Sequence, residues 1–317
     1  MYMIRLIKIF KVLIFSVLGL LVLISALFGY RDKPVEELKL KYAQSPSAFI
    51  KMDGMDVHYR DEGNAFDTLP LVLIHGTSSS LHTFDDWTNA LKSTRRVVRM
   101  DIPAFGLTGP FPDRNYSMSH YVAFMEHFLQ SKGIKRCIMG GNSLGGQIAW
   151  HFTAKNPDIV EKLILIDAAG YPLDSKSVPI AFRLARKPII NKIITFITPR
   201  FIAKSSLENV YADKTKVSDA LAERYFDMAL STGNRQALVD RMSMSKDTNG
   251  IASIKNIQTP TLVLWGENDM LIPVKNAHLF HNDLPNDTLV ILKNAGHVPM
   301  EESPKESLEV VLEFLRR

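Results

Sequence analysis

The chain has 317 residues, 46% of them hydrophobic and 22% charged, which is enough apolar material for a sizeable buried core. The formal net charge of +5 is concentrated in the first 33 residues, where five basic side chains face one acidic one and leave about +1 for the remainder. This distribution excludes a nucleic-acid partner, and the single cysteine, Cys137, excludes an internal disulfide and a cysteine-based metal site.

Residues 1–30 are predicted to form a transmembrane signal anchor. The stretch Val12–Tyr30 holds nineteen residues without a charge, and as a helix it would span roughly 28 Å, close to the thickness of a bilayer core. Basic residues are more frequent before this stretch than after it, which places the N-terminus in the cytoplasm and the rest of the chain on the far side. The alternative is a cleaved signal peptide and a secreted protein, for which Leu27 stands where cleavage requires a small residue.

Two sections of the chain, residues 51–170 and 251–317, are predicted to form one α/β core after a charged linker at residues 31–50. Short apolar runs rich in β-branched residues alternate there with helical patterns, as is typical of parallel strands buried on both faces. The expected strands are Leu71–Ile74, Val97–Met100, Cys137–Met139, Leu163–Ile166, Thr261–Leu264 and Thr288–Leu292, and two expected helices are Ser119–Ser131 and Leu144–Lys155. This alternation predicts a mostly parallel, doubly wound sheet.

The strand pattern stops between residues 171 and 250, which predicts a helical cap inserted into the core. The first part of this region, Pro179–Lys204, carries six basic residues, no acidic residue and many apolar side chains. A basic amphipathic segment of this kind can lie on a membrane surface. In the alternative interpretation it is a lid whose apolar face covers the site beneath and whose basic face is solvated, and the two interpretations are compatible.

A five-residue sequence, Gly141-Asn142-Ser143-Leu144-Gly145, fits the pattern G-x-S-x-G between an expected strand and an expected helix. This is the context of a nucleophile elbow, in which a tight turn projects a serine hydroxyl above the sheet. Ser143 is therefore the predicted nucleophile. The backbone amide of Leu144, at the helix N-terminus, is expected to bind an oxyanion. The second amide of the oxyanion hole is assigned to Thr77, with Ser78 as the alternative, because both follow the first central strand.

A serine hydroxyl requires a general base, and the base requires a carboxylate that orients it. His297 is the candidate base, because it lies in a loop after the last expected strand. Asp269 follows the strand Thr261–Leu264 and gives the chain order Ser, Asp, His expected of this fold. Asp167, at the end of the strand Leu163–Ile166, is the rival acid. No histidine pair has the spacing of a metallohydrolase motif, so neither a metal nor another cofactor is expected.

These motifs together resemble the α/β-hydrolase superfamily, in particular its serine esterases and lipases related to the meta-cleavage carbon–carbon hydrolases. The resemblance extends from about residue 51 to residue 317 apart from the cap. The matching segments are His75-Gly76, Asp101–Gly106, Gly140–Gly146, Trp265–Asp269 and Gly296-His297. Membrane-anchored monoacylglycerol lipases are similar in combining an anchor with a capped hydrolase. One departure is Ala104, where glycine is usual.

The expected function is that of a membrane-anchored serine hydrolase, which cleaves carboxylic esters of lipid-like or acyl type through an acyl-enzyme intermediate. A carbon–carbon hydrolase with the same triad is the alternative, and a catalytically inactive binding protein is a third class. The expected partners are a small-molecule or lipid ester and membrane lipid. Lipid would be contacted by the N-terminal helix and, if the cap lies on the membrane, by Pro179–Lys204 as well.

Overall fold

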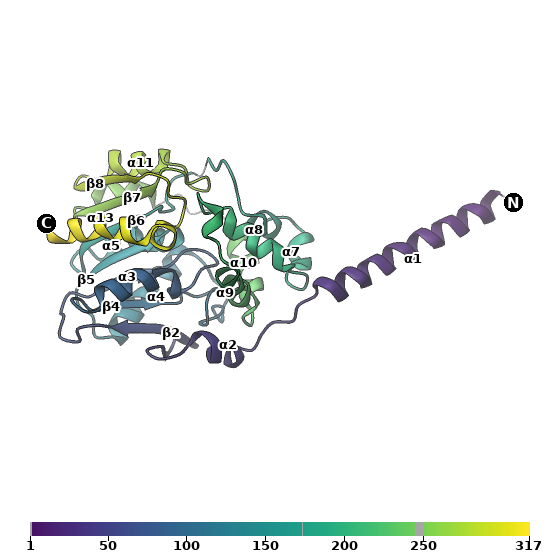
Figure 1. Cartoon of the computed structure of the whole chain (residues 1–317), viewed down its shortest axis with the longest axis horizontal. Helices are drawn as coiled ribbons and strands as arrows, with labels where there is room; N and C mark the ends of the chain where they lie inside the picture. Colours follow the sequence, from purple (N-terminus) through teal and green to yellow (C-terminus); the bar gives the residue numbers. More distant parts are fainter. Residues whose placement is uncertain (1, 173, 245–249) are drawn as a thin grey trace.

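The computed structural model describes residues 2–172, 174–244 and 250–317 (Figure 1). Within them lies one sheet of eight strands in the order β1-β2-β4-β3-β5-β6-β7-β8. The strands are β1 (Ala48–Met52), β2 (Met55–Glu62), β3 (Leu71–Ile74), β4 (Val97–Met100), β5 (Cys137–Asn142), β6 (Val160–Ile166), β7 (Thr261–Gly266) and β8 (Asp287–Leu292). Neighbouring strands from β4 to β8 are parallel, whereas β2 is antiparallel to both β1 and β4. The mostly parallel sheet expected from the sequence is confirmed.

Helices cover both faces of the sheet, and alternate residues of each central strand pack against opposite layers. Helices α3 (Asp85–Leu91) and α13 (Pro304–Arg316) contribute to the core on one face, which contains Leu71 and Leu73 of β3. Helices α4 (Met118–Ser131), α5 (Leu144–Lys155) and α11 (Lys275–Asp283) contribute to the core on the other face, which contains Val72 and Ile74. Because both faces are covered, β3 is apolar and buried along its whole length.

The region between β6 and β7, residues 171–250, is called the cap below, and its described residues contribute no strand to the sheet. Its helices are α6 (Ile180–Ala185), α7 (Ile190–Ile193), α8 (Arg200–Glu208), η2 (Lys214–Lys216), α9 (Asp219–Leu230) and α10 (Asn234–Ser243), and η3 (Ile251–Asn256) follows it. In Figure 1 helices α7 to α10 lie on the side of the core from which α1 projects.

Helix α1 (Tyr2–Phe28) contains most of the uncharged stretch and is long and apolar enough to cross a membrane. None of its most apolar window is buried against the rest of the protein. In Figure 1 it extends away from the body as a single straight helix. Length and composition of this kind are shared by membrane anchors and signal sequences.

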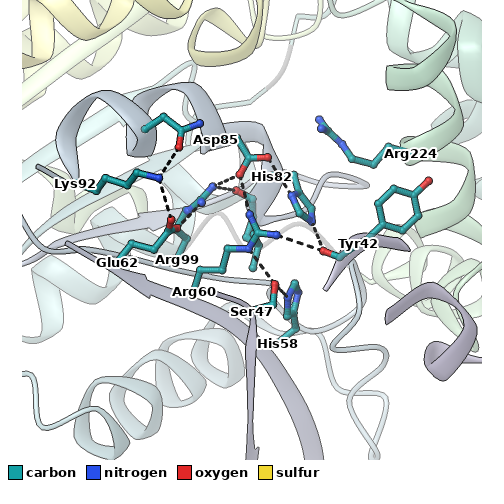
Figure 2. A network of polar contacts seen from close by, with 12 residues as sticks. Tyr42, Ser47, His58, Arg60, Glu62, His82, Asp85, Lys92, Arg99 and Arg224 are labelled. Carbon is teal, nitrogen blue, oxygen red and sulfur yellow. Dashed lines mark hydrogen bonds and ion pairs between the residues drawn. The ribbon is translucent and has the colours of Figure 1, made fainter. Parts of the chain in front are cut away.

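The segment after α1, which the sequence assigns to a linker at residues 31–50, contains α2 (Val35–Tyr42) and the beginning of β1. Figure 2 shows how the end of this segment is bonded to the core. The carbonyl oxygen of Tyr42 accepts hydrogen bonds from His82 Nε2 at 3.1 Å and Arg60 Nη2 at 3.4 Å, and Ser47 Oγ accepts one from Arg60 Nε at 2.9 Å. The segment therefore follows the surface of the body.

A cluster of ion pairs lies beside these contacts (Figure 2). Asp85, at the start of α3 after η1 (Leu81–Phe84), lies 2.6 Å from Arg99 Nη1 and 3.1 Å from His82 Nδ1, and Arg99 Nη2 lies 2.7 Å from Glu62 Oε2. Burial alone would raise the pKa of Asp85, but the bonds from His82 and Arg99 hold it well below its usual range. The cluster thereby joins β2, β4 and α3 at the edge of the sheet that carries the N-terminal segment.

The hairpin of β1 and β2 was not predicted from the sequence. Charged residues interrupt both strands, because β1 and β2 lie at the antiparallel edge of the sheet and are not buried on both faces. A signal was nevertheless present in the pair Asp53-Gly54, whose φ angles of 51° and 76° form the two-residue turn between Met52 and Met55. An Asp-Gly pair of this kind is among the strongest short-range indications of a hairpin.

Candidate active site

Ser143 lies in a sharp turn between β5 and α5, with φ of 56° and ψ of −115°. A positive φ is costly for a residue with a side chain, on the order of 1–3 kcal/mol. Glycine neighbours make the turn possible: a Cβ atom at Gly141 would lie 2.2 Å from the Gly145 carbonyl oxygen, and one at Gly145 would lie 2.1 Å from the Ile74 carbonyl oxygen. The strand, turn and helix of a nucleophile elbow are therefore present at the position the sequence indicates.

Asp269 and His297, which are separated by 28 positions in the sequence, are brought together beyond the ends of β7 and β8. Both side chains are buried, and His297 Nδ1 lies 2.7 Å from Asp269 Oδ2. The other oxygen of Asp269 accepts hydrogen bonds from the amides of Leu271 at 2.8 Å and Ile272 at 2.9 Å. These amides hold the carboxylate in one orientation, so that its free oxygen is directed at the imidazole.

Asn142 connects the elbow to the histidine loop, a role that the sequence analysis did not assign. Its side-chain amide donates to the carbonyl oxygen of His297 at 2.9 Å and to that of Ile166 at 3.1 Å. Because Asn142 immediately precedes Ser143, the first of these bonds joins the backbone of His297 to the elbow, and the second joins the elbow to the end of β6. The motif contained this residue only as the variable position of G-x-S-x-G, and nothing in the sequence indicated its partner.

Glu302, in the short helix α12 (Pro299–Glu302), is a second residue that the sequence analysis missed. It is buried, and its carboxylate accepts hydrogen bonds from the amides of Gly296 at 2.7 Å and Asp213 at 2.7 Å. In addition, the amide of His297 donates to the carbonyl oxygen of Val210 at 2.8 Å. The loop that carries His297 is therefore bonded to the cap as well as to the core.

Asp167, the rival acid, lies close to the same pair and is fully buried. One carboxylate oxygen each of Asp167 and Asp269 and a ring nitrogen of His297 all lie within 4.8 Å of one another, a spacing that a metal ion could also use. Asp167 accepts a hydrogen bond from the Gly266 amide at 3.0 Å. Burial, with the neighbouring Asp269 charge adding to it, raises the pKa of Asp167 well above its usual range. Asp269 is thus the acid bonded to the imidazole, and Asp167 is the one that burial favours in its neutral form.

The loop after β3 passes directly over the elbow, since a Cβ atom at Gly76 would lie 3.0 Å from Ser143 Cβ. Thr77 is the next residue of this loop, and Leu144 is the first residue of α5, where backbone amides have no partner within the helix. Of the two residues proposed for the oxyanion hole, Leu144 therefore directly follows Ser143, and Thr77 lies in the loop that contacts it.

His75 has a supporting position beneath that loop. Its Nε2 accepts a hydrogen bond from the amide of Ile102 at 3.0 Å, so that Nδ1 carries the proton and donates to the Gly76 carbonyl oxygen at 2.8 Å. Burial lowers the pKa of His75 below its usual value, which favours this neutral form. Asp101 accepts bonds from the amides of Leu81 and Leu107, each at 2.7 Å. His75 and Asp101 therefore hold the loops after β3 and β4 to each other.

Ala104, which stands where the resemblance leads us to expect glycine, adopts a φ of 87°. Its amide donates to the carbonyl oxygen of Gly109 at 2.7 Å, which closes the turn after β4. Alanine is therefore held in a conformation that glycine adopts without strain. The departure affects this turn and does not involve Ser143, Asp269 or His297.

A cavity of about 130 Å³ lies between these loops and the cap. On the core side it is lined by Thr77, Ser78 and Ser79, and on the cap side by Val210, which also bonds to the amide of His297. Most of the other lining side chains are apolar and include Phe105, Phe182, Ile194, Ile197, Ile202 and Met228. An apolar cavity therefore begins at the loop that contacts the elbow and extends beneath the cap.

Known proteins provide three informative comparisons. The chain is 26% identical over 277 residues to the 2-hydroxy-6-oxo-6-(2'-aminophenyl)hexa-2,4-dienoic acid hydrolase of Metapseudomonas resinovorans, a match that covers 85% of this chain and 90% of the relative. The crystal structure of a putative lipase from Acinetobacter baumannii is similar with a TM-score of 0.71 and 23% identity, over 89% of this chain and 94% of that one. The structure of a membrane phospholipase A, described as a bacterial virulence factor, is similar with a TM-score of 0.70 and 24% identity, over 98% of each chain.

The family match agrees with the elbow, the sheet order and these likenesses. Residues 70–304 match the α/β hydrolase fold family, a range that includes Ser143, Asp269, His297 and the whole cap. Homologous proteins include lipases, esterases and hydrolases of meta-cleavage products. Since the matched range is well over half of the 317 residues, the chain belongs to the α/β hydrolase fold family and is a hydrolase.

Proposed function

We propose that this hydrolase is a membrane-anchored serine esterase that acts on carboxylic esters with an acyl chain. The oxygen of Ser143 attacks the ester carbonyl carbon while His297 Nε2 accepts the serine proton, and Asp269 stabilises the resulting imidazolium. The amides of Leu144 and Thr77 bind the oxyanion. His297 then gives the proton to the departing alcohol, and water hydrolyses the acyl-enzyme. The observation that carries this proposal is the 2.7 Å contact between His297 and Asp269 beside a strained serine elbow.

An acyl chain is the substrate group that suits the cavity. The walls of the cavity are mostly apolar and begin at Thr77, the residue assigned to the oxyanion hole. A hydrocarbon chain placed there would leave water, a favourable change of about 0.8 kcal/mol for each methylene buried. The ester carbonyl would remain at the elbow.

A panel of substrates tests the proposed chemistry. We expect purified protein to hydrolyse p-nitrophenyl esters and monoacylglycerols, with kcat/KM rising as the acyl chain is lengthened until the cavity is filled. Hydrolysis of esters that does not respond to chain length would contradict the role of the cavity. The measurement is the initial rate across a series of chain lengths at one detergent concentration, so that substrate presentation remains constant.

The second candidate is a carbon–carbon hydrolase, and it is favoured by the relative that acts on a substituted hexadienoic acid. The same serine, histidine and aspartate would serve that reaction. A ring-fission dienoate is therefore included in the panel, and a kcat/KM for the dienoate above that for every ester would favour this alternative.

The location at a membrane is proposed from α1, with the N-terminus in the cytoplasm and the catalytic domain on the far side. The likeness to a membrane phospholipase A, which covers 98% of this chain, supports this location. We expect the full chain to sediment with membranes and to resist extraction by alkaline carbonate, because a spanning apolar helix is held essentially irreversibly. A mature N-terminus near Tyr30, determined by sequencing the native protein, would instead indicate a cleaved signal peptide.

A further inference from the structure

We propose that the outer face of the cap is a second membrane contact, which sits in an anionic bilayer surface beside the end of α1. This inference rests on the proposed membrane anchor. The surface concerned, called the cap patch, consists of six exposed large apolar side chains: Ile180, Ile189, Ile190, Ile193, Phe196 and Phe201. All of them come from α6, α7, α8 and the turns between these helices.

The cap patch lies directly at the end of α1. The ring of Phe28, the last residue of α1, is 6.3 Å from the ring of Phe201, and the amide of Tyr30 donates to the carbonyl oxygen of Phe196 at 3.0 Å. Gly29 forms a β-bridge with Ile197 between them. If α1 crosses a bilayer, its C-terminal end lies at the membrane surface, and these contacts bring the cap patch to the same level.

The attachment between α1 and the cap is made by several consecutive residues. The guanidinium of Arg235, in α10, bonds to the carbonyl oxygen of Tyr30 at 2.8 Å and to Asp32 Oδ1 at 2.6 Å. Lys33 then forms an ion pair with Asp227 of α9 at 2.8 Å, and its amide donates to the Leu230 carbonyl oxygen at 2.7 Å. These bonds fix the chain as it leaves α1, so the anchor would hold the cap in one orientation toward the membrane.

The charges around the cap patch favour an anionic surface. Arg183, Arg186, Lys187 and Lys192 are exposed, and no carboxylate of the described residues lies within ion-pair distance of them. Farther along the same segment, Arg200 and Lys204 are paired with Glu223 and Asp219. Unpaired cations interleaved with exposed apolar side chains are the composition of a segment that lies at the headgroup level of anionic membranes.

The cap patch and the cavity lie on opposite sides of the same layer of cap residues. Ile197, Thr198 and Arg235 line the cavity, and each also bonds to residues between Phe28 and Asp32. A cap seated in the membrane therefore places one wall of the cavity next to lipid. An ester drawn from the bilayer would need to cross only this layer to reach the elbow.

Tryptophan reporters in the full-length protein test the proposal. The three native tryptophans, Trp87, Trp150 and Trp265, are fully buried, so the spectrum of the unsubstituted protein can be subtracted. The variants Phe196→Trp and Leu13→Trp place a reporter in the cap patch and in α1. The matched control is Phe66→Trp, in the loop between β2 and β3, where Phe66 is exposed. Glu62 and Leu71, which flank this loop, both pair with Val97, at the end of the strands opposite the cap.

Each variant is reconstituted into vesicles of phosphatidylcholine and phosphatidylglycerol, with and without brominated acyl chains. We expect brominated lipid to quench the emission of the reporters in Leu13→Trp and Phe196→Trp, and to leave that of Phe66→Trp unchanged. Quenching of Leu13→Trp without quenching of Phe196→Trp would overturn the cap patch and leave the anchor standing. Absence of quenching in Leu13→Trp would reject the anchor itself.

Two further measurements separate the remaining outcomes. A blue-shifted Phe196→Trp emission that brominated lipid does not quench would mean that protein, such as a second copy of the chain, covers the cap patch, and would also overturn the proposal. Equal quenching in vesicles of phosphatidylcholine alone would contradict the role of the basic side chains. Turnover of a soluble short-chain p-nitrophenyl ester by Phe196→Trp is expected to equal that of the unsubstituted protein, so that failure of the membrane contact is distinguished from failure of the proposed chemistry.

Discussion

Replacement of Ser143 by alanine is expected to abolish ester turnover and labelling by a fluorophosphonate probe while leaving the fold intact. In the proposed mechanism the serine oxygen forms the acyl-enzyme bond, and alanine has no group that could form it. Alanine retains a Cβ atom, so the backbone at φ 56° is no more strained than with serine, and the amide of residue 143 still donates to the Ile166 carbonyl oxygen at 3.0 Å. The Ser143→Ala substitution should therefore affect the chemical step and leave the stability of the fold unchanged.

The matched control is Ser80→Ala, which removes the hydroxyl of another buried serine in the loop after β3. This variant should keep both turnover and labelling. Circular dichroism and urea unfolding in detergent establish that the two variants are folded. A Ser143→Ala protein that still reacts with the probe would show that a different residue is the nucleophile.

Replacement of Asp269 by asparagine is expected to lower kcat by roughly 10⁴-fold, the loss found when a triad histidine is held in the wrong tautomer. Asp269 Oδ2 accepts the proton of His297 Nδ1 at 2.7 Å, and an asparagine amide at that position would donate instead. The imidazole would then turn its proton-bearing nitrogen toward Ser143. The remaining oxygen would still accept the amides of Leu271 and Ile272, so the loop should keep its shape.

Asp167→Asn is the comparison that decides between the two buried acids. Burial already favours the neutral form of Asp167, and asparagine is neutral and nearly equal in shape, so the bond from the Gly266 amide can be retained. We expect this variant to keep most of its turnover. The assignment of the acid would be reversed if Asp167→Asn lost activity on the scale given above while Asp269→Asn did not.

Several elements could be predicted from the sequence because the signals that produce them are local. The strands Leu71–Ile74 and Val97–Met100 and the helix Leu144–Lys155 have the bounds that the sequence predicts. A short apolar run is buried on both faces wherever it enters the sheet. An Asn-Pro pair ends the helix, because the residue before proline avoids the helical conformation. The elbow is equally local, because the strained residue Ser143 and the glycines that permit the turn, Gly141 and Gly145, belong to the same short motif.

Contacts between distant segments could not be predicted in the same way. Asn142 and His297 are 155 positions apart, and Asp32 and Arg235 are 203 positions apart. A single sequence does not indicate which distant residue a polar side chain will bond to, because that partner is determined by the folding of the whole sheet and cap. Glu302 is an example, since an acid near the start of a helix is most often an exposed residue, whereas here it is buried and bonded to three amides.

The sequence by itself determined the strand-helix order, the serine elbow, the apolar N-terminal helix and the order Ser143, Asp269, His297, because each depends on residue types within one short segment. Only the tertiary structure decided that Asp269, and not Asp167, bonds to the imidazole, and that the segment after α1 is attached to the cap. Both outcomes depend on distances between segments that are far apart in the chain. Such distances arise only when the sheet and the cap have closed around a common core.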